Sequence, residues 1–492
     1  MTSLYEQLNV VFETHAENPC LICADGEDWS YGQLADYAGR VSAVLTGQGV
    51  KPGDRVVAQV PKSRQNLALY LGVLRSGAVY VPLNTAYTAA ELDYFIADAE
   101  PRLFIGKHVR QDVMSLTLDE RGKGSLNDLV MATQGHGPLV SRHDDDLAAI
   151  VYTSGTTGRS KGAMLSHRNL AANAYALNQA WGWRSDDVLL HALPIFHVHG
   201  LFIANHCALL NGSAMHWLPR FEPEAVMAAL ASSTVMMGVP TFYSRLLATE
   251  GFAELSFSHI RVFICGSVPL TEQVFQQWET VTGHRILERY GMSETIINTT
   301  NPLEGERVAA TVGFPLPGLD LRVADGQGRP VPTGEVGTIE VRGESVFSGY
   351  WRMPEKTAEE IRADGFFITG DLGTIDESGR VSIVGRGKDL VISGGYNIYP
   401  KEVESVLDDM PEVLESAVIG VPHADFGEAV VAVVVPSAEP VTQQQVDAAL
   451  ADKLARFKQP KAVINVTELP RNTMGKVQKN LLRESHQQLF LS

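Results

Sequence analysis

Alternating strand-like and helix-like segments, over about the first 300 residues, most restrict the fold that this 492-residue chain can adopt. Short apolar runs rich in β-branched residues are followed by longer stretches with helical periodicity, and the two kinds recur in turn. The clearest examples are the expected strands 55–60, 79–82 and 102–105 and the expected helices 63–76 and 89–98. This order is typical of α/β layers on largely parallel sheets. We therefore predict an α/β fold whose large N-terminal domain consists of parallel α/β subdomains.

The pattern of the sequence changes twice in its second half. From about residue 319, short strands are separated by glycine- and aspartate-containing turns, which predicts a small β barrel or twisted sheet attached to the α/β body. The glycine-flanked stretch 385–389 follows, and we interpret it as a hinge. We expect residues 1–386 to form the large domain and residues 387–492 a smaller, mobile α+β domain. The expected elements of the smaller domain are helices 400–409 and 442–457 and strands 414–420, 429–436 and 461–466.

Composition and charge exclude several classes of partner. The formal net charge of −17 repels polyanions, so we expect neither nucleic acid nor an anionic membrane surface as a partner. Residues 1–19 contain no lysine or arginine, unlike a signal or transit peptide, and runs such as 429–436 are far shorter than the roughly 20 apolar residues that span a bilayer. Cys20 and Cys23 form a CxxC pair with no second pair nearby, so we interpret them as small residues of a strand. These features predict a cytoplasmic protein.

Residues 152–162, YTSGTTGRSKG, have the composition of a phosphate-binding loop. Glycines let backbone N–H groups converge on an anion, hydroxyl groups donate further hydrogen bonds, and Lys161 adds positive charge. The spacing differs from that of a Walker A loop. The segment 147–152 is apolar and β-prone and the segment 169–178 is rich in alanine, so we expect the loop to join a strand to a helix. Taken alone, such a loop is equally consistent with an ordinary solvated connection.

Six further motifs follow this loop in order along the chain. They are PIFHVHG at 194–200, ERYGMSET at 288–295, TGD at 369–371, GR at 385–386, GGYNIYPK at 394–401 and NTMGK at 472–476. Together with the loop, they resemble the motifs of the adenylate-forming superfamily of acyl-CoA synthetases, luciferases and nonribosomal adenylation domains. The resemblance extends over residues 29–478. It implies an enzyme that joins a carboxylic acid to ATP as an acyl-adenylate, releases pyrophosphate, and then transfers the acyl group to a thiol with release of AMP.

The resemblance implies an ATP site assembled from several motifs. Glu294 would hold Mg²⁺, the cofactor, because this cation prefers carboxylate and phosphate oxygens. Tyr290 would lie along adenine, and Asp371 and Arg386 would bond to the ribose hydroxyls. Outside this context, the same residues are consistent with ordinary turns, charged loops or core packing. The other ATP-binding residues that the resemblance implies are Thr153, Ser154, Gly155, Thr156, Thr157, Lys161, Glu288, Gly291 and Ser293.

The resemblance also implies the residues of the two chemical steps. Lys476 would offset the negative charge that builds up as the carboxylate approaches the α-phosphate. Rotation of the C-terminal domain about Lys388 would then exchange Lys476 for a face that binds coenzyme A, where Gly394 and Gly395 line the tunnel for its thiol arm. His197 would gate the reacting carboxylate as a catalytic residue. Packing of His197 in the core is the alternative, and the sequence does not separate the two.

The acid is indicated by Arg289, which lies inside the motif that would contact adenine, and by His199, which lies in the segment expected to face the acyl group. An arginine can hold a second carboxylate through two parallel hydrogen bonds. These motifs resemble those of the malonyl-CoA synthetases, which implies malonate, ATP and coenzyme A as the substrates. In the alternative interpretation, Arg289 pairs with Glu288 or Glu294. A short-chain or other dicarboxylate acyl-CoA synthetase, a stand-alone enzyme that loads a carrier protein, and a non-catalytic nucleotide-binding protein also stay open.

Overall fold

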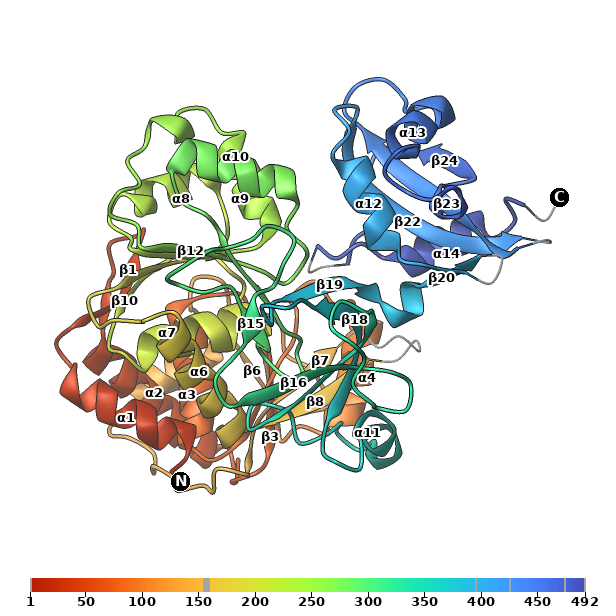
Figure 1. Cartoon of the computed structure of the whole chain (residues 1–492). Helices are drawn as coiled ribbons and strands as arrows, with labels where there is room; N and C mark the ends of the chain where they lie inside the picture. The colour runs from red at the N-terminus through yellow and green to blue at the C-terminus, as the bar shows by residue number, and fades with distance from the viewer. Residues whose placement is uncertain (1, 154–159, 394–395, 424–425, 473–474, 491–492) are drawn as a thin grey trace.

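The computed structural model describes residues 2–153, 160–393, 396–423, 426–472 and 475–490. These residues form four β-sheets with helices packed on them. In Figure 1, the first three sheets make up a large body, and the fourth belongs to a smaller C-terminal unit drawn in blue. The fold class is therefore the predicted one: an α/β body with a small β-sheet subdomain, followed by an α+β unit.

The first sheet confirms the alternation of strands and helices. In spatial order its strands are β6 (Ser115–Thr117), β5 (Leu103–Gly106), β3 (Arg55–Gln59), β4 (Val79–Pro82), β7 (Leu147–Thr153) and β8 (Lys161–Ser166). All pairings are parallel except that of β7 with β8. The helices of this part of the chain are α2 (Tyr31–Gly47), α3 (Arg64–Arg75), α4 (Ala89–Ala99) and α5 (Ser125–Ala132). The five segments predicted between residues 55 and 105 correspond to β3, α3, β4, α4 and β5.

The second sheet is parallel in its centre. In spatial order its strands are β15 (Phe314–Pro315), β14 (Thr299–Thr300), β13 (Leu287–Tyr290), β12 (Val262–Cys265), β11 (Val235–Gly238), β9 (Val188–His191), β10 (Ala214–Trp217), β1 (Pro19–Cys23) and β2 (Trp29–Ser30). The strands from β13 to β1 pair in parallel, and only the edge strands β2, β14 and β15 pair antiparallel. Cys20 and Cys23 lie in β1 as predicted, and both are free thiols.

The helices of this second part include one π-helical segment. They are α1 (Leu4–Thr14), α6 (His167–Ala180), η1 (His199–Ala204), α7 (Asn205–Leu209), α8 (Pro223–Leu230), α9 (Pro240–Leu247), η2 (Phe252–Glu254) and α10 (Glu272–Thr282). The π-helical segment is η1, and such segments occur frequently at functional sites. It contains His199, one of the residues expected to contact the acyl group.

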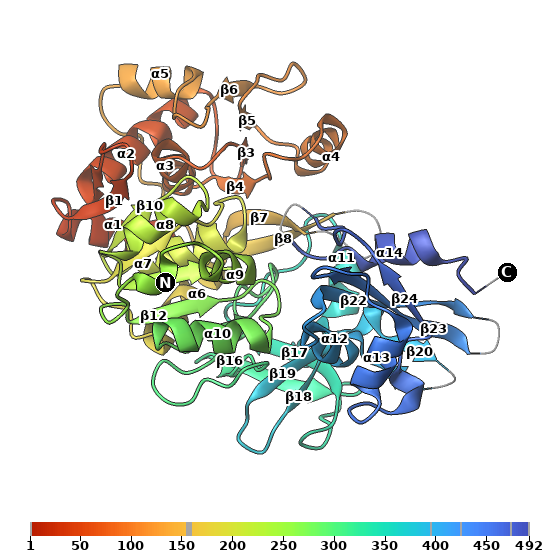
Figure 2. The ribbon, with the colours of Figure 1, turned by 90° about the horizontal axis from the view of Figure 1, so that it is seen from above.

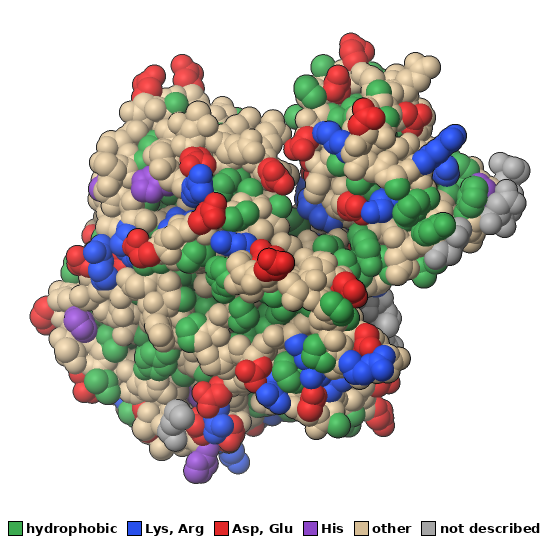
Figure 3. Space-filling model, in the orientation of Figure 1, with side chains coloured by type: hydrophobic (Ala, Val, Ile, Leu, Met, Phe, Trp, Pro, Cys, Tyr) green, Lys and Arg blue, Asp and Glu red, His purple; other side chains and the backbone are tan. Residues whose placement is uncertain are grey.

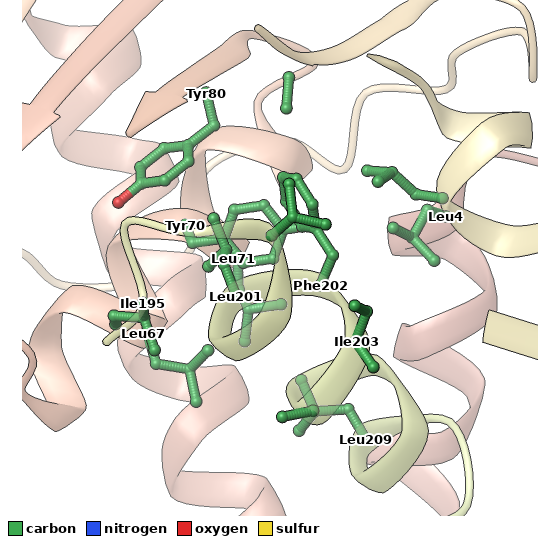
Figure 4. Packing of buried hydrophobic residues seen from close by; sticks show 14 of the residues in the cluster. Leu4, Leu67, Tyr70, Leu71, Tyr80, Ile195, Leu201, Phe202, Ile203 and Leu209 are labelled. Carbon is green, nitrogen blue, oxygen red and sulfur yellow. The ribbon is translucent and has the colours of Figure 1, made fainter. Parts of the chain in front are cut away.

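The core between the two sheets anchors η1. Figure 4 shows Leu201 and Phe202 of η1 against Tyr70 and Leu71 of α3, and all four side chains are buried. The Tyr70 hydroxyl also lies 2.9 Å from Nε2 of His206 in α7. Since burial of each large apolar side chain contributes about 1.5–3 kcal/mol, this contact holds the π-helix firmly on α3.

The third sheet is the small β-rich part predicted from residue 319 onward. Its strands are β16 (Leu319–Ala324), β17 (Gly337–Gly343), β18 (Phe367–Ile375) and β19 (Val381–Arg386), and α11 (Pro354–Glu360) lies between β17 and β18 in the chain. The strands pair antiparallel in sequence order as an open row. Of the two predicted forms, a barrel or a sheet, the described strands therefore adopt the sheet.

The C-terminal unit begins after a single turn of 3₁₀-helix, η3 (Gly387–Asp389). Its strands are β20 (Val391–Ser393), β21 (Tyr396–Ile398), β22 (Val413–His423), β23 (Gly427–Pro436) and β24 (Ala462–Asn465), and its helical segments are α12 (Pro400–Asp408), α13 (Gln443–Leu450), η4 (Arg456–Lys458) and α14 (Lys479–His486). Figures 1 and 2 both show this unit beside the third sheet. The domain division at residue 386 falls between β19 and η3 and stays a prediction. Within the described part of the chain, no helix has the length and apolar character required to cross a membrane.

Two local predictions are wrong. The loop after Thr153 joins β7 to the antiparallel strand β8, and α6 begins only at His167, so the loop does not join a strand to a helix. Distant pairing explains β8, because the backbone of Met164 exchanges hydrogen bonds with Ser348 and Gly349. The predicted helix 442–457 ends at Leu450, whose carbonyl accepts a hydrogen bond from the Gln459 side chain.

Candidate active site

Three predicted nucleotide-binding residues from three separate motifs meet in one cluster. Asp371 of β18 pairs with Arg386 of β19, and Arg386 Nε lies 2.6 Å from Asp371 Oδ1. Tyr290, the last residue of β13, donates its hydroxyl to Asp371 Oδ2 at 2.5 Å. Burial, followed by the nearby Asp371 carboxylate, raises the pKa of Tyr290, so its hydroxyl keeps the proton. Each oxygen of Asp371 has a further lone pair, so the carboxylate can still accept hydrogen bonds from a ligand.

A chain of polar contacts joins the end of the loop to Glu294. Lys161 Nζ, at the start of β8, lies 3.1 Å from Glu360 Oε1 and 4.0 Å from the centre of the Tyr350 ring. The Tyr350 hydroxyl lies 2.6 Å from Glu360 Oε2 and 3.0 Å from Glu294 Oε1. The structure thus brings Lys161 and Glu294 together through Tyr350 and Glu360. Neither linking residue was predicted from the sequence, because Tyr350 lies in none of the motifs and a glutamate in the acidic, exposed stretch of α11 has no local feature that distinguishes it.

The residues around Glu294 fit a Mg²⁺ ion that takes most of its ligands from elsewhere. The carboxylate of Glu294 is buried, with 5% of the residue exposed, and burial raises its pKa. Burying this charged carboxylate costs free energy, and a cation bound beside it would offset that cost. Among the described residues, no group of three or more histidine, cysteine, aspartate or glutamate side chains is arranged to hold a metal. Mg²⁺ is commonly held by one or two carboxylates together with phosphate and water oxygens, which matches this arrangement.

Lys476 reaches this site from the C-terminal unit. Its backbone N–H donates to Asn472 Oδ1 at 2.9 Å, and its carbonyl accepts from the Asn472 N–H at 2.9 Å. Burial, then the charge of Arg386, lowers the pKa of Lys476, while Asp371 and Glu294 act in the opposite direction. The ammonium is therefore close to the residues that surround the nucleotide cluster. Figure 3 shows the notch between the α8–α10 part of the body and the C-terminal unit.

Arg289 lies in a second cluster, made of buried side chains. Only 4% of Arg289 is exposed, and its Nε and Nη2 are buried with no hydrogen-bond partner. No ion pair among the described residues includes it, so the structure gives no support to pairing with Glu288 or Glu294. Burial lowers the pKa of Arg289 to about 10, which leaves the guanidinium charged at neutral pH. A charged group with unused donors in this position is suited to an anionic ligand.

Three neighbours complete the Arg289 cluster. His199 Nδ1 lies 3.2 Å from the Ser267 hydroxyl, while His199 Nε2 is buried without a partner. Ser267 has a φ of 76°, a left-handed conformation that residues other than glycine rarely adopt and that is often found at functional sites. A Cβ at Gly266 would lie 2.6 Å from Arg289 Nη1, so only glycine leaves room for the guanidinium. The sequence analysis missed Gly266 and Ser267, whose proximity to Arg289 arises only from the pairing of β12 with β13.

His197 lies between the two clusters. Burial lowers its pKa to about 3, and the charges of Lys476 and Arg289 act in the same direction. The imidazole is therefore neutral at physiological pH. Its Nδ1 accepts the backbone N–H of His199 at 3.4 Å, which ties it to the start of η1. Both cations act on His197, and its role at the reacting carboxylate stays a prediction.

The remaining predicted residues are distributed around these clusters. Thr153 ends β7, Ser293 and Gly291 precede Glu294, and Lys388 lies in η3. Glu288 is buried and accepts the Leu270 N–H at 3.2 Å; burial raises its pKa to about 7. The roles of all these residues stay predictions. Ser154, Gly155, Thr156, Thr157, Gly394 and Gly395 lie outside the described residues.

Comparison with known proteins extends over nearly the whole chain. Residues 8–351 match the family described as AMP-binding enzyme, and residues 402–476 match the AMP-binding enzyme C-terminal domain. The chain is 34% identical to a malonate–CoA ligase of Arabidopsis thaliana over 545 aligned residues, 98% of this chain and 89% of that protein.

The fold is also similar to solved structures. The ATP-bound MatB of Rhodopseudomonas palustris superimposes with a TM-score of 0.95 at 51% identity, covering 100% of both chains. Apo MatB of the same organism, also 51% identical with 100% coverage of both chains, gives a TM-score of 0.84. The conformation described here is thus closer to the ATP-bound form, in agreement with the position of Lys476. On the family match and these likenesses together, the chain belongs to the AMP-binding enzyme family.

Proposed function

We propose that this protein is a malonate–CoA ligase, which makes malonyl-CoA, AMP and pyrophosphate from malonate, ATP and coenzyme A. The observation that supports this choice of acid is the charged, buried guanidinium of Arg289 with two unused donor atoms. A buried cation without a partner is costly, and a carboxylate ligand would remove that cost. The relatives reported above include a malonate–CoA ligase, which favours malonate among the possible diacids.

Malonate fits the spacing of the site because it carries two carboxylates on one carbon. One carboxylate would bind Arg289, His199 and Ser267, and the other would point past His197 toward Lys476. Since burial keeps His197 and His199 neutral, their N–H groups would donate hydrogen bonds without adding charge. Arg289 would then provide the specificity for a second negative charge.

In the first half-reaction, an oxygen of the free carboxylate attacks the α-phosphorus of ATP and pyrophosphate leaves. Lys476 would neutralise the charge shared by the carboxylate and the α-phosphate, and Lys161 would bind the outgoing phosphates. Asp371 and Arg386 would hold the ribose, with Tyr290 along the adenine. Glu294 would hold Mg²⁺, which supplies positive charge to the phosphate oxygens.

In the second half-reaction, the thiol of coenzyme A attacks the acyl carbon of malonyl-adenylate, and AMP leaves. The charges of Arg386, Asp371 and Glu294 act on Lys476 in the present conformation, so a rotation of the C-terminal unit would have to take it away from them first. We place the hinge at Lys388, in the single turn between the third and fourth sheets. Gly394 and Gly395 would line the path of the thiol arm after this rotation.

Replacement of Lys388 by proline should separate the two half-reactions. Proline fixes φ near −65°, which suits the 3₁₀ turn seen here but prevents a large change of φ at this residue. We therefore expect adenylation, measured by ATP–pyrophosphate exchange, to persist while thioester formation from purified malonyl-adenylate collapses. Thioester formation at the wild-type rate would show that the chain pivots elsewhere.

Replacement of Gly266 by alanine should disturb the Arg289 cluster and leave the nucleotide cluster unchanged. The new methyl group would lie 2.6–2.8 Å from three atoms of the guanidinium, so Arg289 would have to move. Displacement of a binding group by about 1 Å can cost on the order of 10²-fold, and we expect a loss of this order in kcat/KM for malonate. Gly47→Ala is the matched control, because a methyl group there meets no atom within 4 Å. Equal kinetics of the Gly266 and Gly47 variants would contradict the proposed packing.

The proposed function is tested by a panel of acids assayed for AMP release with and without coenzyme A. The panel contains malonate, methylmalonate, succinate, acetate and propionate. We expect the highest kcat/KM with malonate and little AMP release without the thiol. A higher kcat/KM with acetate or propionate would indicate a short-chain acyl-CoA synthetase, and adenylation without transfer to coenzyme A would indicate a carrier-loading enzyme.

Location in the cytoplasm belongs to the same proposal. All four cysteines are free thiols, and three of them are buried. Free thiols are usual in a reducing compartment, where disulfides are rare. ATP and coenzyme A are also substrates that this compartment supplies.

A further inference from the structure

Lys62 is a buried lysine without a carboxylate partner. It immediately precedes Ser63, the N-cap residue of α3, and only 8% of it is exposed. No ion pair between described residues involves it. Its Nζ instead lies 2.8 Å from Nδ1 of His191, 2.7 Å from the His191 carbonyl oxygen, and 4.2 Å from the centre of the Trp217 ring.

Two contacts determine which nitrogen of His191 carries the proton. The carbonyl oxygen of Gly200 beside Nε2 can only accept, so the neutral ring is protonated on Nε2, and its Nδ1 accepts from Lys62. Burial lowers the pKa of Lys62, and its amine can donate to Nδ1 whether or not it is charged. Nε2 lies 3.0 Å from the carbonyl oxygen of Gly200 and donates to it. Burial, followed by the charge of Lys62, holds the pKa of His191 well below its usual range, in agreement with a neutral ring. The hydrogen bonds therefore run in one direction, from Lys62 through His191 to Gly200.

Gly200 connects this chain of hydrogen bonds to the Arg289 cluster. It directly follows His199 in η1, and a Cβ at Gly200 would lie only 2.1 Å from the carbonyl oxygen of Pro194. The backbone is therefore tightly packed at this point, and His199 is the neighbouring residue in the same turn of η1. On its other side, η1 rests on α3, as Figure 4 shows for Leu201 and Phe202.

We propose that Lys62 is a positioning residue for the second carboxylate of the substrate, acting through His191 and Gly200 on His199. This inference rests on the proposed malonate–CoA ligase function. Without the Lys62 donor, Nδ1 of His191 is left without a partner, and only the Gly200 carbonyl still favours the Nε2–H form. The hydrogen bond from His191 to Gly200 is then less well held, and His199, the residue before Gly200, is less well placed beside Ser267 and Arg289. Partners that orient a ligand-binding histidine from behind have effects of about 10- to 100-fold in metal sites, and we expect a similar size here.

The test is Lys62→Met, which keeps the length and apolar stem of the side chain and removes its donors. We expect kcat/KM for malonate to fall by roughly 10- to 100-fold, mainly through KM, while the weak activity with propionate changes little. The ring ¹⁵N shifts of His191, assigned by comparison with His191→Phe, should report a loss of the pure Nε2–H form. Arg64→Met is the matched control, because Arg64 lies two residues away but pairs with Asp25 and Glu27.

His191→Phe provides an independent measurement, since it keeps a ring against Trp217 and removes both hydrogen bonds. It should give the same malonate-selective loss, and combining it with Lys62→Met should add little, because the two residues act in series. Equal losses with malonate and propionate, additive losses in the double variant, or an unchanged His191 tautomer in Lys62→Met would each overturn the inference. A wild-type enzyme without malonate activity would instead refute the proposed function. The tautomer measurement would then remain as the test of the hydrogen bonds that run from Lys62 through His191 to Gly200.

Discussion

Replacement of Lys476 by alanine is expected to remove the first half-reaction and spare the second. In the conformation described here, the charges of Asp371 and Glu294 act on Lys476, and the charge of Lys476 acts on His197, so we place its ammonium where the carboxylate and the α-phosphate would meet. Loss of one charge-stabilising donor in such a site typically costs about 10²- to 10³-fold in rate. ATP–pyrophosphate exchange in the presence of malonate measures this step directly. Thioester formation from purified malonyl-adenylate measures the second step, in which the lysine has left the site.

A matched control is Lys479→Ala. Lys479 lies three residues further along the same segment and pairs with Glu404 inside the C-terminal unit. We expect its loss to affect stability without separating the half-reactions. A comparable loss of both half-reactions in Lys476→Ala would mean that the lysine holds the C-terminal unit in place and takes no part in adenylation.

The fold was predictable where local pattern and tertiary structure agree. The alternation between residues 55 and 105 became β3, α3, β4, α4 and β5, because each buried strand is followed by a helix that covers the sheet. Prediction failed at β8, whose partner residues 348 and 349 are nearly 200 positions away. It also failed after Leu450, where the chain continues in turns and the Leu450 carbonyl accepts from the backbone N–H groups of Lys453 and Leu454 as well as from the Gln459 side chain.

The residues of the candidate site could be predicted only where they lie in a recognisable sequence motif. Residues such as Asp371, Arg386 and Glu294 lie in short patterns that suit nucleotide binding, and the structure brings them into one region. Ser267, Tyr350 and Lys62 lie in no such pattern. Their positions depend on strand order, on the path of the chain before α11, and on the packing of α3 against η1. Sequence spacing contains no information about these contacts.

Replacement of Arg289 by methionine is expected to destroy malonate activity and to stabilise the protein. Removing one partner of a buried ion pair typically costs about 3–5 kcal/mol. At about 1.4 kcal/mol per decade, this corresponds to roughly two to three and a half decades in kcat/KM for malonate. Propionate lacks the second carboxylate, so its weak activity should be retained. Arg289→Lys should recover only part of the malonate activity, because an ammonium cannot bind a carboxylate through two parallel hydrogen bonds.

The stability of the Arg289→Met protein separates this proposal from a structural role. In the absence of substrate, burial lowers the pKa of Arg289 to about 10 and leaves Nε and Nη2 without partners, so the charged side chain destabilises the fold. Methionine is apolar and of similar length, and we therefore expect thermal unfolding of the free variant at a higher temperature than for the wild type. Malonate should raise the unfolding temperature of the wild type and leave that of the variant unchanged. A lower unfolding temperature, with equal losses for malonate and propionate, would show that Arg289 supports the fold or the nucleotide site, and the choice of malonate would lose its structural basis.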